Sequence, residues 1–382
     1  MEKIKLLVTD MDEKEWNRIK KDYEGWTVIR DDGSIHPCIG CFSCWKRTPG
    51  ECCIKDGYDQ MGLLISRADE IVYNSRFTYG GFSSFVKNVF DRSLGYVLPY
   101  FEVSENEMHH KKRYAETKRI TFIFRGEDLT DEEKAMATRY VQAVCRNLRG
   151  EVKEVVFEQE SKPEGEWENT VNPVQGKTVL LNCSIRGINA NSEKFLTALG
   201  KNLEKPFDYL RLAEFSIRMD ELIERLLSAD TLVLAMPLYV DGLPSNVIRL
   251  LERLQKASPG LNLNLYVRAN LCLYESHQLN NLLAMIRYWC DISGYRYCGG
   301  LAVSAGELIG VLIKKMRSGP VRPLTEALKN MGKAVDEGEM FENRYVQPAM
   351  FPRALYIAVA NLSWDLNSLK AGMKPKDLYR RL

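Results

Sequence analysis

Residues 68–92 read ADEIVYNSRFTYGGFSSFVKNVFDR, and residues 229–253 read ADTLVLAMPLYVDGLPSNVIRLLER. Each stretch starts with an apolar run, passes through a glycine-containing turn and ends in an amphipathic segment, which predicts a strand, a turn and a helix. The stretches align without gaps at an offset of 161, and the identical pairs are Ala68/Ala229, Asp69/Asp230, Val72/Val233, Gly81/Gly242, Ser84/Ser245, Val86/Val247 and Arg92/Arg253. Any two strand–turn–helix units share an apolar pattern, but the turn glycine and the helix-end arginine favour a tandem duplication.

Further apolar runs alternate with helical segments on both sides of these two stretches. The predicted strands are residues 3–10, 27–30, 70–75, 119–124 and 151–157 in the first half, and 177–183, 207–210, 231–236, 264–269 and 297–303 in the second. Strands that alternate with helices form crossover units, so each half is predicted to be a five-stranded parallel sheet with helices on both faces.

The boundary between the halves is a polar segment with glutamate, proline and glycine. We therefore predict a first domain at 1–160, a linker at 161–176, and a second domain at 177–382 with a helical C-terminal extension. Leu6-Leu7 of the first predicted strand aligns with Leu180-Leu181 at an offset of 174. The first half thus carries 13 extra residues between its first and third strands, in the interval that holds a cysteine-rich loop.

Composition excludes several classes of protein. The 382 residues include 53 Lys and Arg against 51 Asp and Glu, a formal charge of +2, which gives no electrostatic argument for binding nucleic acid or an anionic membrane. The sequence contains no run of about 18 consecutive apolar residues, so we predict no membrane-spanning helix. The N-terminus has no secretory signal pattern, so we expect a cytoplasmic protein.

Five of the ten cysteines lie between Cys38 and Cys53. Cys38, Cys41, Cys44 and Cys52 have the spacing C-x2-C-x2-C-x7-C, and closely spaced cysteine triplets recur in ferredoxins, where thiolates hold an iron–sulfur cluster. A zinc site more often uses two separated C-x2-C pairs. Two alternatives stay open: a thiol-rich loop that binds nothing, and a zinc- or thiol-based redox sensor.

The loop from Ser184 to Ser192 follows the first strand of the second half and opens a helix. Its hydroxyl, amide and guanidinium groups suit a phosphate at a helix N-terminus, although a plain loop with an N-cap residue is an alternative. The loop at the same place in the first half, residues 9–15, has four carboxylates and one lysine. It would repel a phosphate, so the two halves are predicted to differ at this position.

Two more segments of the second half follow predicted strands: 237–245 after the third, and 270–277 after the fourth. In open α/β sheets ligands bind beyond the carboxyl ends of the strands, so these turns should face the same crevice as the phosphate loop. Tyr239 and its counterpart Tyr79 in the first half can stack on a flat ring, or simply pack at a domain interface. His277 could act as a general acid or begin a helix, and a lone histidine in such a segment is more often structural.

The cysteine segment followed by Ile54-Lys55-Asp56, the turn at Tyr79-Gly80-Gly81, the Asp91-Arg92 pair and the second-half Pro237-Leu238-Tyr239 segment resemble the flavodoxin-like family of NADPH-dependent FMN reductases and iron–sulfur flavoproteins. The resemblance implies sheet order 2-1-3-4-5, FMN at the carboxyl edge and hydride from NAD(P)H. The FMN-binding residues it implies are Ser184, Arg186, Asn189, Asn191, Ser192, Pro237, Leu238, Tyr239, Val240, Asp241 and Gly242. We add Tyr274, from the segment after the fourth strand, as a further cofactor-binding residue. The implied ligands of a [4Fe-4S] cluster are Cys38, Cys41, Cys44 and Cys52.

The halves depart from the family in complementary ways: the first keeps the cysteines and lacks the phosphate loop, and the second does the reverse. We therefore expect an internal pseudo-dimer with one FMN in the second domain, acting as an NAD(P)H oxidoreductase or electron-transfer flavoprotein toward a small-molecule or protein acceptor. The chain is either sufficient as a monomer or forms a homodimer. Leu273 replaces an expected glycine and would crowd a flavin, which keeps open a degenerate scaffold that acts through protein contacts.

Overall fold

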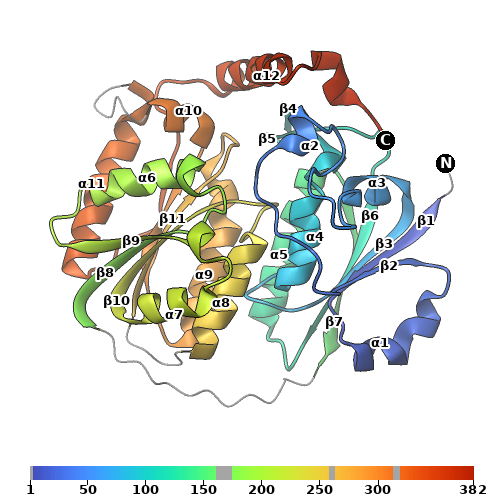
Figure 1. Ribbon diagram of the computed structural model, residues 1–382, viewed down its shortest axis with the longest axis horizontal. Coiled ribbons are helices and arrows are strands. Elements are labelled where there is room, and N and C mark those ends of the chain that lie inside the picture. Colours follow the sequence, from blue (N-terminus) through green and yellow to red (C-terminus); the bar gives the residue numbers. More distant parts are fainter. Residues whose placement is uncertain (1–2, 161–173, 258–262, 313–318) are drawn as a thin grey trace. The chain divides into compact units, whose positions relative to one another are not determined.

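The computed structural model describes residues 3–160, 174–257, 263–312 and 319–382 (Figure 1). The chain forms two compact units: unit 1 is Met1–Pro163 with Ala354–Leu382, and unit 2 is Glu164–Arg353. The predicted linker lies mostly outside the described residues. Within the described ranges, no helix is long and apolar enough to cross a membrane.

Unit 1 contains a five-stranded, fully parallel sheet. Its order, from edge to edge, is β2 (Thr27–Arg30), β1 (Ile4–Thr9), β3 (Ala68–Arg76), β6 (Arg119–Gly126) and β7 (Glu151–Gln159). In strand sequence this is 2-1-3-4-5, the order of flavodoxin-like sheets, so the prediction for this half is confirmed. Tyr73 of β3 stacks on Phe90 at 4.0 Å between ring centroids, in a buried aromatic core that includes Phe82 and Phe122.

The helices of unit 1 connect these strands and hold its loops. Those before the C-terminal segment are α1 (Glu13–Ile19), α2 (Ser43–Lys46), α3 (Met61–Arg67), α4 (Ser84–Arg92) and α5 (Asp131–Leu148). The helix α2 lies inside the cysteine segment, and α4 follows the turn after β3. An antiparallel hairpin of β4 (Val97–Ser104) and β5 (Glu107–Lys112), which no sequence pattern predicted, follows α4.

The C-terminal segment belongs to unit 1, whereas the sequence analysis assigned it to the second domain. It contains α12 (Arg353–Lys370), whose Asn361 side chain accepts from the Phe101 backbone N–H at 2.7 Å and donates to the Phe101 carbonyl at 3.1 Å. The Arg113 guanidinium donates to the carbonyls of Leu378 and Arg380 at 2.8 and 2.6 Å. These long-range bonds to the hairpin explain the assignment, and no local pattern encodes them.

Unit 2 contains a six-stranded parallel sheet, so the prediction of five strands is wrong by one. Its order is β13 (Arg344–Val346), β12 (Arg296–Val303), β11 (Asn264–Asn270), β10 (Ala229–Pro237), β8 (Val174–Asn182) and β9 (Phe207–Arg211). The extra edge strand β13 has three residues, too few to show an alternating pattern. The helices are α6 (Asn191–Gly200), α7 (Met219–Leu227), α8 (Ser245–Ala257), α9 (Asn280–Ser293), α10 (Gly306–Leu312) and α11 (Arg322–Glu337).

The two units repeat the same core elements. The strands β3 and β10 have equivalent bounds at the offset of 161, as do the first residues of α4 and α8. In β1 and β8, however, Leu7 lies beside Val72 and Leu180 lies beside Val233, so these strands correspond at an offset of 173 rather than 174. Strands buried on both faces lack polar alternation, and their register is therefore hard to align from sequence.

Candidate functional site

The carboxyl edge of the unit 2 sheet brings the predicted site segments together. Backbone and side-chain hydrogen bonds join the loops that follow β8, β10, β11 and β12. They are Asn246 Nδ2 to the Cys183 carbonyl at 2.9 Å, Leu238 N to the Asn270 carbonyl at 2.7 Å, and Ala305 N to the Leu273 carbonyl at 2.8 Å. These bonds place the segments at one edge of the sheet, and their facing a common crevice stays a prediction.

The N-terminus of α6 has no side-chain cap among the described residues: its N-cap position is Ala190. The first N–H groups of a helix lack intrahelical partners and attract anions. Ser192 does not cap the helix, because its buried hydroxyl donates to Asn270 Oδ1 at 2.8 Å. Asn191 Oδ1 accepts from Lys194 Nζ at 3.0 Å, and Asn189 is exposed. An uncapped N-terminus of this kind suits an anionic ligand.

Asn182 organises the loop before α6, and the sequence analysis missed it. Its Oδ1 accepts from the Ser184 backbone N–H at 3.0 Å, and its Nδ2 donates to the Gly187 carbonyl at 3.1 Å and to Glu193 at 2.7 Å. The Glu193 carboxylate also pairs with Arg211 at 2.7 Å, which offsets its negative charge near the helix N-terminus. The only signal for Asn182 in the sequence is an amide at the end of an apolar strand.

The turn after β10 holds unusual backbone conformations. Tyr239 and Gly242 bond to each other through their backbones at 3.2 and 3.1 Å, and the residues between them have positive φ, 40° at Val240 and 56° at Asp241. A β-branched residue rarely adopts the left-handed region, so Val240 is strained, and such strain gathers at functional sites. The side chain of Asp241 is buried, whereas those of Pro237, Leu238 and Tyr239 are half-buried.

The loop after β11 carries the remaining predicted residues. The Tyr274 hydroxyl donates to the Phe351 carbonyl at 2.7 Å, which fixes the ring at this edge. Leu273, expected to crowd a flavin, is 4% exposed. His277 is exposed in the 3-10 turn Ser276–Leu279.

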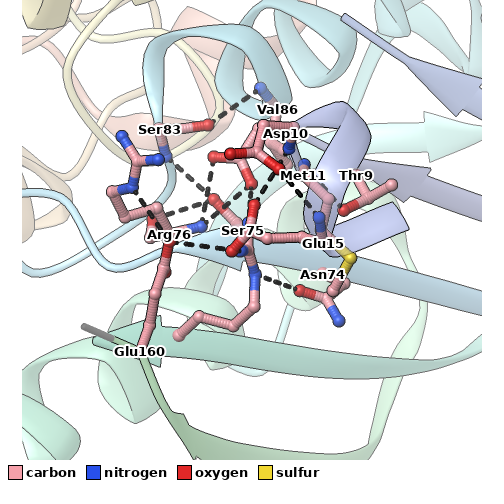
Figure 2. Close-up of polar contacts among 12 residues, drawn as sticks. Thr9, Asp10, Met11, Glu15, Asn74, Ser75, Arg76, Ser83, Val86 and Glu160 are labelled. Carbon is pink, nitrogen blue, oxygen red and sulfur yellow. Dashed lines mark hydrogen bonds and ion pairs between the residues drawn. The ribbon is translucent and has the colours of Figure 1, made fainter. Parts of the chain in front are cut away.

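The corresponding edge of unit 1 is filled by the protein's own carboxylates (Figure 2). Asp10 accepts from the Arg76 backbone N–H with both oxygens at 3.1 Å, and it also pairs with Arg125. Arg125 further contacts Glu15 at 2.6 Å and Glu160 at 3.3 Å.

The helix α1 of unit 1 is closed by a capping box. Glu15 N donates to Asp12 Oδ1 at 2.8 Å, and Asp12 N donates to Glu15 Oε2 at 2.9 Å. These side chains satisfy donors that stay uncapped in α6. The two units therefore differ in the charge and capping of their first helix.

The cysteine loop of unit 1 is fixed by Arg92, at the end of α4. Its buried guanidinium donates to the carbonyls of His36 and Ile54 at 2.8 and 3.0 Å, on either side of the loop, and forms two 2.8 Å bonds to Asp56. Burial alone would raise the pKa of Asp56, but the bonds from Arg92 and from the His36 backbone hold it at about 2. This one arginine therefore closes both ends of the loop.

The predicted cluster ligands influence one another electrostatically. Burial, with the charges of Asp91, Cys52 and Cys41, raises the pKa of Cys38 to about 12. Burial, with the charges of Cys38, Cys52 and Cys41, raises the pKa of Cys44 well above its usual value. A fifth cysteine, Cys53, has its sulfur 3.6 Å from that of Cys41. No three His, Cys, Asp or Glu side chains in the described ranges are arranged to hold a metal ion.

Comparison with known proteins gives partial similarities. No family model matches the chain. A 62-residue stretch, 16% of the chain, is 37% identical to an iron–sulfur flavoprotein of Methanocaldococcus jannaschii, and the match spans 31% of that relative.

Solved structures with similarity include an FMN-dependent NADH-azoreductase of Bacillus anthracis in complex with FMN (11% identity, TM-score 0.31, 42% of this chain and 99% of that one). Another is an NAD(P)H:quinone oxidoreductase of Methanothermobacter marburgensis (12% identity, TM-score 0.30, 41% of this chain and 96% of that one). The fold assignment rests on the strand order of the two sheets rather than on these scores.

Proposed function

We propose that the chain is an FMN-dependent NAD(P)H oxidoreductase or electron-transfer flavoprotein with a single FMN in unit 2. The observation that carries the proposal is the contrast between two equivalent helices. The N-terminus of α6 is uncapped, whereas that of α1 is closed by Asp12 and Glu15 and lies beside Asp10 and Arg125. This contrast supports a phosphate at the N-terminus of α6 in unit 2 rather than at that of α1 in unit 1.

The residues of unit 2 suit the parts of FMN. Backbone N–H groups between Ser184 and Ser192, with Arg186, would hold the phosphate, and the strained turn from Pro237 to Gly242 would hold the ring with Tyr274. FMN supplies the redox chemistry when bound, by taking up hydride from NAD(P)H and passing electrons on. The chain's own contribution is to bind and orient the flavin and to place backbone donors beside it. The acceptor is a small molecule or a protein.

For unit 1 we propose that Cys38, Cys41, Cys44 and Cys52 hold a [4Fe-4S] cluster. Four thiolates are the donor set of such clusters, and the four cysteines lie in one loop whose two ends Arg92 ties together. Their side chains would have to converge on the cluster, since no three of them are arranged around a metal ion in the described ranges. The stretch similar to an iron–sulfur flavoprotein supports the same assignment. The chain would then be a pseudo-dimer in which one unit carries the cluster and the other the flavin.

The FMN site is tested by titrating the flavin-free full chain with FMN and following flavin fluorescence. We expect a stoichiometry of about one FMN per chain, and Arg186→Ala should raise the Kd for FMN about tenfold, because one charge-assisted contact is lost. Arg18→Ala, at an exposed position of α1, is the matched control and should leave the Kd unchanged. Two flavins per chain, or an unchanged Kd in Arg186→Ala, would contradict the assignment.

A further inference from the structure

Arg268 is a buried cation near the carboxyl edge of the unit 2 sheet, where the predicted FMN-binding loops lie. It lies in β11 with no exposed surface, and its Nη1 donates to Asn270 Oδ1 at 2.6 Å. The guanidinium carbon is 3.8 Å from the centre of the Phe195 ring, in α6. Its Nε and Nη2 have no hydrogen-bond partner among the residues that the structure describes.

The surroundings of Arg268 differ from those of the other buried arginines. Arg92 and Arg125 each face a carboxylate, and Arg113 donates to backbone carbonyls. A buried charge without a counterion is costly, and burial lowers the pKa of Arg268 well below its usual value. The partners found for Arg268, Asn270 and Phe195, are both neutral. Arg268 therefore lacks the compensating anion that its burial calls for.

The anion that would compensate Arg268 can be accommodated at the N-terminus of α6. Asn270 Oδ1 accepts from Arg268 and also from the Ser192 hydroxyl in the first turn of α6. The guanidinium is thus one shared acceptor away from the uncapped helix end. The carboxylate of that turn, Glu193, is already paired with Arg211. A cation and a helix N-terminus that meet at one place attract the same anion.

We propose that Arg268 and the N-terminus of α6 form a subsite for a dianionic phosphate monoester, in which Arg268 is the buried countercharge acting through Asn270 and Ser192. The inference rests on the proposed function and extends it, because it makes Arg268 the positioning residue that sets the preference for FMN over riboflavin. The phosphate would compensate the guanidinium charge, and the charge would favour the phosphorylated flavin.

The test compares Kd values for FMN and riboflavin in the full chain with Arg268→Met, Arg268→Lys and the control Arg296→Met. Arg296 lies in the neighbouring strand β12, is exposed and donates to Asn264 and the Gly338 carbonyl. Arg268→Met should raise the Kd for FMN about tenfold and leave that for riboflavin within about twofold, because only the phosphate contribution is lost. Arg268→Lys should retain most of the preference, and Arg296→Met should change neither Kd.

A second readout separates this role from a structural one. Methionine removes an unpaired buried cation and retains apolar volume, so Arg268→Met should raise the Tm of the flavin-free chain while it weakens FMN binding. Equal weakening of both flavins together with a lower Tm would overturn the proposal.

If the wild-type chain binds neither flavin, the proposed function fails, and inorganic phosphate then tests the subsite alone. A Tm that rises with phosphate in the wild type and not in Arg268→Met would still support the subsite. No phosphate dependence in the wild type would overturn it.

Discussion

At the scale of single residues, equivalent positions have acquired different roles. Arg92 is the last residue of α4 in unit 1, whereas its equivalent Arg253 lies within α8 of unit 2, which continues to Ala257. Arg92 is buried and ties both ends of the cysteine loop, whereas Arg253 is half-exposed and pairs with exposed Asp220 at 2.8 Å. An exposed pair contributes little to stability, whereas breaking a buried pair leaves an uncompensated charge. The cysteine loop therefore makes Arg92 structurally essential in unit 1.

The pair of Asp56 and Arg92 predicts a pH dependence. The folded-state pKa of Asp56, about 2, lies below its ordinary 3.8, so its contribution to stability is present above pH 3.8 and is lost as the pH falls toward about 2. The free energy of unfolding of the wild type should exceed that of Asp56→Asn at neutral pH, and the difference should shrink across this window. Urea unfolding at several pH values measures it, with Asp220→Asn as the control. A difference that is constant with pH would be the contrary result.

At the scale of elements, long-range contacts decide where α12 belongs. Its Asn361 amide pairs with both backbone groups of Phe101, and its Asp365 accepts from the Tyr100 hydroxyl at 2.6 Å. These bonds attach α12 to strand β4 of the hairpin and so anchor the helix to unit 1.

Asn361→Ala should loosen this attachment. Two partly buried backbone groups of Phe101 lose their partner, which costs about 1–3 kcal/mol. Hydrogen exchange of the amides in residues 353–370 should therefore accelerate about tenfold or more relative to the wild type. Asn367→Ala, at an exposed position of the same helix, is the matched control and should exchange as the wild type does. Equal exchange in both variants would show that this amide does not anchor α12.

Sequence patterns predicted most of the core and little of its periphery. Buried strands and glycine-containing turns can be recognised from local sequence patterns. The turns at 78–81 and 239–242 form the same backbone bridge at the predicted offset of 161. The hairpin of β4 and β5, the three-residue β13 and the position of α12 depend on contacts between distant segments. Arg268 stands visibly in an apolar strand, but only the fold shows that its guanidinium lacks a counterion. The charge contrast between residues 9–15 and 184–192 was, by contrast, readable from composition alone.

At the scale of the whole molecule, the same core fold occurs twice, and the two units carry different sets of functional features. Unit 1 combines a carboxylate-filled sheet edge with a cysteine loop fixed by Arg92, and unit 2 combines an uncapped helix, a strained turn and an unpaired buried arginine. Neither unit carries both sets of features. The division of labour that we propose, with a cluster in unit 1 and a flavin in unit 2, would account for this pattern.

The most direct test of this account is the visible absorption spectrum of the full chain purified without oxygen, with FMN added and the unbound flavin removed. We expect two flavin bands, equivalent to about one FMN per chain, over a broad sulfur-to-iron shoulder. Flavin bands without the shoulder would support the proposed FMN-dependent function and contradict the proposed [4Fe-4S] cluster. A featureless spectrum that added FMN does not change would contradict the central claim and favour a scaffold that acts through protein contacts.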